Sequence, residues 1–287
     1  MIIDGKAFAA DLRQRIAALV PAFVTKTGRS PGLAVVLVGE DPASQVYVGS
    51  KKKATVEAGM ESFEHKLSAS VSQDELIALV ETLNADPAVD GILVQLPLPA
   101  HMDDKAVIAA IDPAKDVDGF HLYNIGGLVT GNTIFSPCTP YGVVKLLESE
   151  AIPIEGQNVV IVGASNIVGK PMALMLMAAD ATVSICHAKT RDLAQHTILA
   201  DILVVAAGVP NLILPQMVKS GAVVIDVGIN RLPDGSITGD VDFAGVSAKA
   251  SAITPVPGGV GPMTVTMLLE NTTSSAERSA RQSLTQC

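Results

Sequence analysis

The sequence has no tryptophan, and aromatic residues make up only 3% of its 287 residues. It therefore lacks the aromatic platforms on which single-stranded nucleic acids stack. Positive charge is also in deficit, because the formal net charge is −9, which argues against binding to a nucleic-acid backbone. Both deficits indicate that nucleic acid is not a partner.

Cysteine is scarce as well: Cys138, Cys186 and Cys287 lie far apart. This favours a reducing compartment and excludes a CxxC metal site. Hydrophobic residues make up 48% of the chain, but no run of about 18 apolar residues occurs, so we expect no membrane span. The N-terminus lacks the pattern of a secretory signal. We predict a soluble, cytoplasmic protein of one or two domains without a metal site.

One segment, Asn158 to Met172, has the pattern of a strand, a glycine turn and a helix. Val159 to Val162 is an apolar run typical of a buried parallel strand, and Gly163 ends it. Gly169 opens an apolar segment of helical length, whose N-terminal N–H groups would bind a dinucleotide pyrophosphate. The usual GxGxxG fingerprint is incomplete because Ser165 replaces the second glycine. Alone, the motif leaves an ordinary strand–helix connection open.

Further apolar runs follow this segment, separated by stretches of helical length. The predicted strands are Ala181–Cys186, Asp201–Ala206 and Ala222–Val227. Their alternation with helices predicts a doubly wound parallel sheet. The N-terminal part alternates in the same way, without a glycine fingerprint. Its predicted strands are Leu33–Val38, Ser62–Leu67 and Gly91–Gln95, and its predicted helices include Pro42–Gly59 and Ser72–Leu83, the latter with a capping box of Ser72 and Glu75. The fold class is therefore α/β, with two α/β domains, the second a Rossmann-type doubly wound parallel sheet.

The connections are less regular. Asp4 is expected to cap a first helix that Pro21 kinks or ends, and Asp112 to Pro140 is predicted as a linker with loops. An apolar helix is expected at Met263 to Leu269, followed by a solvated polar end from Asn271. If that last helix packs on the N-terminal part, residues 1–120 and about 264–287 form one domain and residues 121–263 the other.

Chemistry-bearing side chains occur on the predicted helix Pro42–Gly59. Ser44, Tyr47 and Lys51 are spaced three and four residues apart and share one face. The tyrosine ring can stack on a ligand and the lysine can move a proton, but Lys51 also fits a solvated basic run of Lys51 to Lys53. YxxxK occurs in short-chain dehydrogenases too, where it follows the glycine turn. Here it precedes Gly163, so that family is rejected.

Two further candidates lie near predicted strand ends. Gln95 ends a buried strand, where open α/β sheets bind ligands, although it could also cap the turn before Pro97. Asp118, in KDVDGF, could accept two N–H bonds from a planar amino-heterocycle, although an ordinary Asp-Gly turn also explains it. Cys186 and His187 are neighbours on a strand and face opposite sides, so they cannot share a metal ion.

The chain contains, in order, EDPASQVYVGSKKKA, GILVQLPLP, KDVDGFH, VGASNIVGKP and TPVPGGVGPMT. Together these motifs resemble the methylenetetrahydrofolate dehydrogenase/cyclohydrolase family over essentially the whole chain. The resemblance implies a homodimer with a cleft between two domains, acting in one-carbon metabolism and purine biosynthesis. It implies that 5,10-methylenetetrahydrofolate is oxidised with NADP to 5,10-methenyltetrahydrofolate, which is then hydrolysed to 10-formyltetrahydrofolate. A monofunctional member and a non-catalytic dinucleotide-sensing protein on the same fold are the alternatives.

The same resemblance implies roles for individual residues. Tyr47 would stack on the aminobenzoyl ring of folate, and Asp118 would bind the pterin. Lys51 would be the main catalytic group, with Gln95 hydrogen-bonded beside it. The glycine loop would close over the substrate with Gly258, Gly259 and Pro262. The cofactor would contact Gly163, Ala164, Ser165, Gly169 and Ile229.

The segment Cys186 to Arg191 bears on the cofactor. An acidic residue about 20 residues after the glycine turn would bind the ribose of NAD, but this segment has none and contains Lys189 and Arg191. NADP is therefore favoured, with NAD still possible. Many family members carry arginine at Ala164 and serine at Ala188, which help to bind the 2′-phosphate, so Lys189 or Arg191 would have to compensate.

The implied chemistry suits these residue types. The electrons for hydride transfer come from the substrate nitrogens, so positioning is the main requirement and no metal is needed. Hydrolysis of the methenyl cation requires a proton to leave water and another to reach the leaving nitrogen. A lysine with a lowered pKa could do both, and Lys51 is the predicted group.

Overall fold

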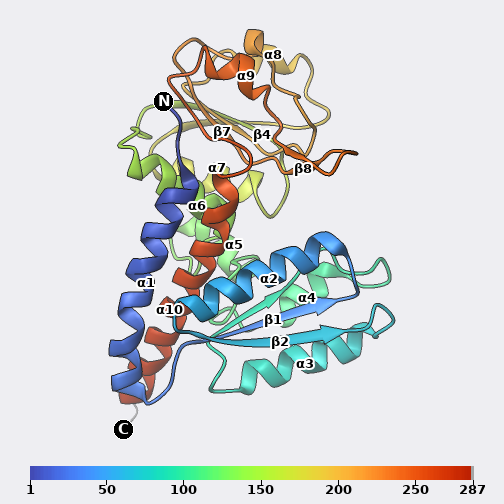
Figure 1. Cartoon of the computed structure of the whole chain (residues 1–287), viewed down its shortest axis with the longest axis vertical. Helices are drawn as coiled ribbons and strands as arrows, with labels where there is room; N and C mark the ends of the chain where they lie inside the picture. Colours follow the sequence, from blue (N-terminus) through green and yellow to red (C-terminus); the bar gives the residue numbers. More distant parts are fainter. Residues whose placement is uncertain (286–287) are drawn as a thin grey trace. The chain divides into compact units, whose positions relative to one another are not determined.

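The structure of the protein is a computed structural model, which describes residues 1–285 of the chain (Figure 1). The chain divides into two compact units, one built from Met1–Ala10 and Pro137–Thr264, the other from Asp11–Ser136 and the chain from Val265 onward. We call them the first and second unit. Met1–Ala10 join the first unit because Ile2 forms a parallel bridge with Ile253 and Lys6 N–H donates to Gly258 O. Each unit is thus assembled from segments far apart in sequence.

The second unit contains a three-stranded parallel sheet in the order β2-β1-β3. The strands are β1 (Gly32–Val38), β2 (Glu61–Leu67) and β3 (Gly91–Val94), and the helices that follow them are α2 (Pro42–Glu57), α3 (Gln73–Ala85) and α4 (Asp104–Ala110). Every residue of β1 is buried, because alternate side chains pack on both faces of the central strand. Ala34 and Val36 share a core cluster with Leu76 and Val80 of α3.

Helix ends in this unit follow local rules. Asp41 caps α2 by accepting the N–H of Ser44 at 2.8 Å. The capping box of Ser72 and Glu75 is present at the start of α3, which confirms that prediction. Gly59 follows α2 with a φ of +76°, the left-handed conformation that ends many helices.

The first unit contains a five-stranded parallel sheet in the order β10-β7-β6-β4-β5. Its strands are β4 (Asn158–Val162), β5 (Thr182–Cys186), β6 (Ile202–Val205), β7 (Val223–Asp226) and β10 (Ala252–Ile253). Helix α6 (Cys138–Ser149) precedes β4. Between the strands lie α7 (Gly169–Ala178), α8 (Leu193–Thr197), the 3-10 helix η1 (Pro215–Met217), α9 (Phe243–Ser247), and a hairpin of β8 (Asn230–Arg231) and β9 (Ile237–Thr238). The predicted α/β class with a doubly wound parallel sheet is confirmed.

The predicted linker Asp112 to Pro140 is wrong in part, because α5 (Leu122–Thr130) and the start of α6 lie within it. Its glycines misled the prediction. A Cβ at Gly127 would lie 2.5 Å from Thr133 Cα, so glycine serves here for close packing of a helix and not as a helix breaker.

Both terminal helices run further than predicted. Helix α1 (Gly5–Thr27) begins after Asp4, whose carboxylate accepts the N–H of Ala7, and continues past Pro21. The buried side chains Val20 and Phe23 lie on either side of this proline, and their packing maintains the helix although proline removes one backbone hydrogen bond.

Helix α10 (Val260–Thr285) also exceeds its predicted range. The expected solvated end from Asn271 is wrong, because Asn271, Thr272, Thr273 and Ser275 are buried. Their polar groups are satisfied: Thr272 Oγ1 donates to Leu268 O at 2.8 Å and Ser275 Oγ to Ala114 O at 2.9 Å. None of the helices in the part of the chain that the structure describes is both long and apolar enough to cross a membrane.

Candidate functional site

The predicted pair of Lys51 and Gln95 is joined in the structure. Lys51, on α2, is only 7% exposed, and its Nζ donates to Gln95 Oε1 at 2.9 Å. Gln95 directly follows β3 and donates from its Nε2 to Leu96 O at 2.7 Å. The lysine thus lies at the carboxyl-terminal end of the parallel sheet, the edge where open α/β sheets bind ligands.

Neighbouring lysines on the same helix have different surroundings. The Lys52 side chain is 54% exposed and its Nζ lies 3.2 Å from Glu64, while Lys53 lies 3.8 Å from Glu57 at the surface. Successive helical residues point about 100° apart, and of these three lysines only Lys51 is buried. The interpretation of Lys51 as part of a solvated basic run is therefore wrong.

Tyr47 and Asp118 belong to the same unit as Lys51. Tyr47 lies one helical turn before Lys51 and is exposed, and Ser44 on the same face is buried. Asp118 is half-buried and follows Asp116, which the sequence analysis did not single out. The only sequence signal for Asp116 is that it is the first of the two acids in KDVDGF.

Asp116 organises the segment that carries Asp118. Its Oδ2 accepts the N–H of His121 and an Nδ2–H of Asn124, both at 2.8 Å. Burial raises the pKa of the Asp116 carboxyl above its usual value, although the bonds from Asn124 and His121 oppose that shift. Asn124, itself buried, also accepts the N–H of Phe135 at 3.3 Å. These bonds connect Asp116 to residues that follow Asp118, so they fix the loop that carries Asp118.

The glycine turn of the first unit joins β4 to α7. Gly163 has a φ of +127°, and a Cβ there would lie 2.1 Å from Ala206 O. A Cβ at Gly169 would lie 2.0 Å from Gly163 O. Both positions therefore require glycine, and the turn presents bare backbone at the helix N-terminus, which fits a dinucleotide pyrophosphate.

Ser165, which replaces the second glycine of the fingerprint, has a structural role that the sequence did not reveal. Its Oγ accepts the N–H groups of Val168 at 3.1 Å and Gly169 at 3.4 Å. The serine therefore satisfies backbone donors at the start of α7. Ala164, which lies between Gly163 and Ser165, is half-buried.

The loop after β5 carries the predicted contacts to the 2′-phosphate. His187 N–H donates to Thr190 Oγ1 at 2.8 Å, and Lys189 N–H donates to His187 Nδ1 at 3.1 Å. These bonds form a tight turn that leaves Ala188, Lys189 and Arg191 exposed. Burial raises the pKa of the preceding Cys186 thiol, which makes it a poor nucleophile.

Among residues 1–285, no group of three or more His, Cys, Asp or Glu side chains could hold a metal ion.

Two further predicted segments meet in the first unit. Ile229, after β7, is exposed, and its Cδ1 lies 3.7 Å from the position of a Cβ at Gly261. Gly258, in the same glycine loop, has a φ of +108°. A Cβ at Gly259 would lie 2.6 Å from Pro255 O. Pro262 stands in the first turn of α10. The loop predicted to cover the substrate therefore packs beside the turn predicted to contact the cofactor.

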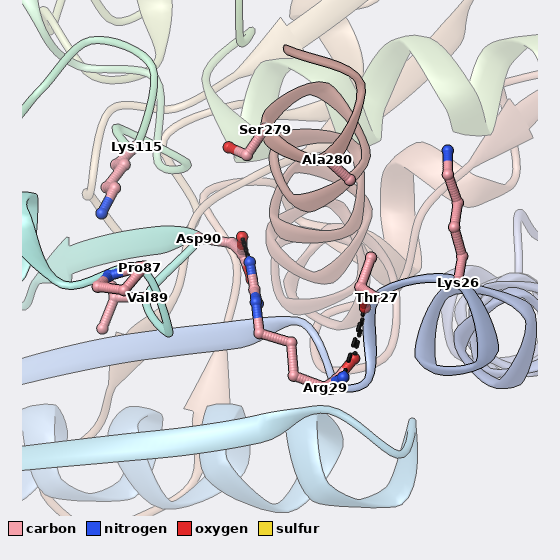
Figure 2. A pocket seen from close by; sticks show the side chains of 9 residues that line it. All are labelled: Lys26, Thr27, Arg29, Pro87, Val89, Asp90, Lys115, Ser279 and Ala280. Carbon is pink, nitrogen blue, oxygen red and sulfur yellow. Dashed lines mark hydrogen bonds and ion pairs between the residues drawn. The ribbon is translucent and has the colours of Figure 1, made fainter. Parts of the chain in front are cut away.

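A pocket of about 360 Å³ lies elsewhere in the second unit, at the amino-terminal ends of β1 and β3. Figure 2 shows Arg29 and Asp90 in its centre, with Lys26 and Lys115 on either side. Arg29 donates to both Asp90 oxygens at 2.6 and 2.7 Å, and Lys115 Nζ donates to Asp86 O at 2.8 Å. Arg29 and Asp90 satisfy each other and Lys115 bonds to backbone carbonyls, so we interpret the pocket as a structural cluster around an ion pair and not as the active site.

Comparison with known proteins completes the description. The family model for the catalytic domain of tetrahydrofolate dehydrogenase/cyclohydrolase matches residues 3–118, and the model for its NAD(P)-binding domain matches residues 137–280. The chain belongs to this family. The resemblance predicted from the motifs is thereby confirmed. The Lys51–Gln95 pair lies within the first match and the Gly163 turn within the second.

Individual relatives agree with the family. Bifunctional protein FolD 3 of Rhizorhabdus wittichii is 60% identical over 284 residues, which is 97% of this chain and 93% of that protein. The solved bifunctional FolD enzyme of Campylobacter jejuni is 53% identical with a TM-score of 0.95, covering 97% and 99% of the two chains. The FolD of Trypanosoma brucei, solved with NADP and an inhibitor, is 39% identical with a TM-score of 0.94 and covers 98% of each chain.

Proposed function

We infer that this chain is a bifunctional enzyme of folate one-carbon metabolism. It oxidises 5,10-methylenetetrahydrofolate to 5,10-methenyltetrahydrofolate and hydrolyses that product to 10-formyltetrahydrofolate. Membership of the family over both of its domains supports this function. The observation that carries it is the buried Lys51 in contact with Gln95 at the carboxyl-terminal sheet edge, because the hydrolysis needs a proton-transfer group shielded from bulk water.

Lys51 is proposed to move protons in the hydrolytic step. Water attacks the methenyl carbon, so that a C–O bond forms and one C–N bond breaks. Lys51 takes one proton from the attacking water and gives it to the nitrogen that leaves, and the remaining hydroxyl proton is released to solvent as the formyl C=O bond forms. The amide of Gln95 fixes the position of Nζ through their 2.9 Å hydrogen bond. Because Lys51 must first accept a proton from water, its side chain is proposed to be neutral at the start of this step.

Tyr47 and Asp118 are proposed to hold the substrate. The exposed ring of Tyr47, one turn before Lys51, offers an apolar face to the aminobenzoyl group. The Asp118 carboxylate would accept two N–H bonds from the pterin ring, and the Asp116 network fixes the segment around it. Gly258, Gly259 and Pro262 would close over the folate.

We propose NADP as the preferred dinucleotide. When bound, it supplies the acceptor for the hydride that leaves the one-carbon bridge. Lys189 and Arg191 are exposed after β5, and the segment Cys186–Arg191 contains no carboxylate, which favours a 2′-phosphate. NAD is the second candidate, because Ala164 and Ala188 offer no side-chain donor. The phosphate turn would consist of Gly163, Ala164, Ser165 and Gly169, with Ile229 as a further contact.

A spectrophotometric assay with 5,10-methylenetetrahydrofolate tests both activities and the cofactor. We expect reduction with NADP at least tenfold more efficient than with NAD, followed by decay of the methenyl product. Reduction with NAD alone would keep the function and overturn the cofactor choice. Reduction with neither, from folded protein that still binds folate, would support the alternative of a non-catalytic dinucleotide-sensing protein.

We also propose that the protein forms a homodimer through the first unit. Strand β5 is at the edge of the five-stranded sheet, and Ile185 on it is exposed. An edge strand of this kind is a ready template for pairing with a second copy. Light scattering should give twice the mass of the chain, and a monomer at micromolar concentration would contradict the proposal.

The cytoplasmic location stays a prediction.

A further inference from the structure

Two acidic side chains are buried together beyond the carboxyl-terminal edge of the five-stranded sheet. Asp226 ends β7 and is 3% exposed, and Asp240, which follows β9, is 0% exposed. Glycines make room for both: a Cβ at Gly228 would lie 2.3 Å from Asp240 Oδ1, and a Cβ at Gly239 would lie 1.9 Å from Asp226 Oδ2. Burying two carboxylates so close together is costly unless hydrogen bonds satisfy them.

Asp240 bonds to two separate loops. Its Oδ2 accepts the N–H groups of Ala207 at 2.7 Å and Gly208 at 2.9 Å, in the loop after β6. Its Oδ1 accepts an Nδ2–H of Asn230 at 2.7 Å, directly after Ile229. One carboxylate therefore connects the loops that leave two adjacent strands.

Asp226 in turn fixes Asp240. Its Oδ1 accepts the N–H groups of Gly228 and Asp240, and its Oδ2 accepts that of Val241, each at 3.0 Å. Its own N–H donates to Thr254 Oγ1 at 2.8 Å. The backbone that carries the Asp240 carboxylate is thus held by the last residue of β7.

The connected loops border the phosphate turn. Gly163 approaches Ala206 so closely that a Cβ on it would lie 2.1 Å from Ala206 O, and Ala206 immediately precedes the residues that Asp240 holds. The carboxyl-terminal edge of a parallel sheet is the place where dinucleotides bind. A displacement of the loop after β6 would therefore shift both the glycine turn and Ile229.

We propose that Asp240, fixed by Asp226, is a positioning residue for the dinucleotide: it holds the loop after β6 and the Ile229 turn in the geometry that the cofactor requires. This inference rests on the proposed cofactor site of the first unit. Charge-assisted hydrogen bonds suit the task because they are shorter and stronger than neutral ones. The carboxylate itself does not touch the cofactor.

The test compares NADP affinity with cyclohydrolase activity. Asp240→Ala should weaken NADP binding, measured by calorimetric titration, about tenfold or more. Hydrolysis of supplied 5,10-methenyltetrahydrofolate should change less than twofold, because this step needs no dinucleotide and Lys51 and Gln95 belong to the other unit. Asp242→Ala is the matched control, since Asp242 caps α9 through Gly245 N–H and should leave NADP affinity unchanged.

A side-chain exchange separates positioning from a general loss of packing. Asn230→Asp alone places a carboxylate against Asp240 and should weaken NADP binding. Adding Asp240→Asn restores one donor and one acceptor at the same contact, so the double variant should recover most of the affinity. Comparison of the Asn230→Asp single variant with the double variant tests the positioning role of Asp240 even if the Asp240→Ala protein fails to fold.

Three results would overturn the inference. The first is an NADP affinity of the Asp240→Ala protein no lower than that of the Asp242→Ala protein. The second is a loss of cyclohydrolase activity in the Asp240→Ala protein as large as its loss of NADP affinity. The third is a double variant whose NADP affinity does not recover. Failure of the wild-type protein to bind either NADP or NAD would instead reject the cofactor proposal itself, so the two failures are distinguishable.

Discussion

At the scale of single residues, burial assigns different tasks to identical side chains. Lys51 and Lys52 are neighbours on α2, yet one contacts Gln95 in the protein interior and the other pairs with Glu64 near the surface. The difference follows from the direction in which each residue leaves the helix. We therefore propose Lys51 for proton transfer, and Lys52 offers a control of the same residue type.

Replacing Lys51 by methionine should abolish the hydrolytic step. Methionine keeps most of the apolar stem but has no amine, and general acid–base groups contribute about 100-fold or more to rate. We expect a loss of at least that size in the hydrolysis of 5,10-methenyltetrahydrofolate. Lys52→Met should retain the wild-type rate, and full activity in the Lys51→Met protein would contradict the assignment.

At the scale of elements, α5 shows that two adjacent glycines in one helix can have opposite requirements. A Cβ at Gly126 would meet nothing within 4 Å, whereas a Cβ at Gly127 would lie 2.7 Å from Thr133 N. The close approach of α5 to the chain at Thr133 lets Thr133 Oγ1 donate to Asn124 O at 2.9 Å. Because Asn124 also binds Asp116, this packing supports the segment of Asp118.

The two glycines provide a matched pair of substitutions. Gly126→Ala should stabilise the protein by about 0.5–1 kcal/mol, because alanine loses less backbone entropy in a helix. Gly127→Ala should destabilise it by about 1–3 kcal/mol, because the added methyl group overlaps the backbone at Thr133. Urea denaturation measures both. Equal effects of the two changes would show that the packing at Thr133 does not restrict position 127.

At the scale of the whole molecule, both units depend on segments from opposite ends of the chain. The Met1 ammonium donates to Ser251 O at 2.6 Å in the first unit. In the second unit, Val265 and Leu269 of α10 share a core cluster with Ile16 of α1 and Ala54 of α2. Each unit therefore depends on contacts between segments that are far apart in the sequence, so its stability reflects more than one part of the chain.

The pH dependence of folding stability should reflect the buried acids. Burial raises the pKa of Asp226 from 3.8 to about 6, and the adjacent Asp240 adds to the shift. The folded state therefore binds a proton more tightly than the unfolded state, so this contribution is complete below pH 4 and is lost as the pH rises through 6. This pKa shift corresponds to a change of about 3 kcal/mol at most in the free energy of unfolding.

Asp226→Asn isolates this contribution. The free energy of unfolding of the wild-type protein, minus that of the variant, should fall between pH 4.5 and 7. The subtraction removes the opposite contribution of acids such as Asp41 and Asp201, whose pKa values are lowered by hydrogen bonds from Ser44 and Lys219 and whose stabilisation is lost only in more acidic solution. Urea denaturation at the two pH values provides the measurement, and a constant difference would contradict the assignment.

The sequence by itself determined the α/β class, the strands β1 to β7 and the family, whereas the two-residue strands β8, β9 and β10 were not predicted. Strands such as β1 and β4 were readable because helices cover both faces of a parallel sheet, which requires unbroken apolar runs. The capping box of α3 was readable because its partners are three residues apart. Candidate site residues were identified through the five motifs that resemble the family, because a motif is recognised from the order of residues along the chain.

Only the tertiary structure decided which polar residues are buried and what they bind. The Lys51–Gln95 bond joins residues 44 positions apart, and the Asp240–Ala207 bond joins residues 33 positions apart. Local composition carries no signal for such contacts, so the polar end of α10 resembled a solvated tail and the glycines of α5 resembled a loop. Burial is a property of the surroundings that distant segments create, and those surroundings exist only in the folded chain.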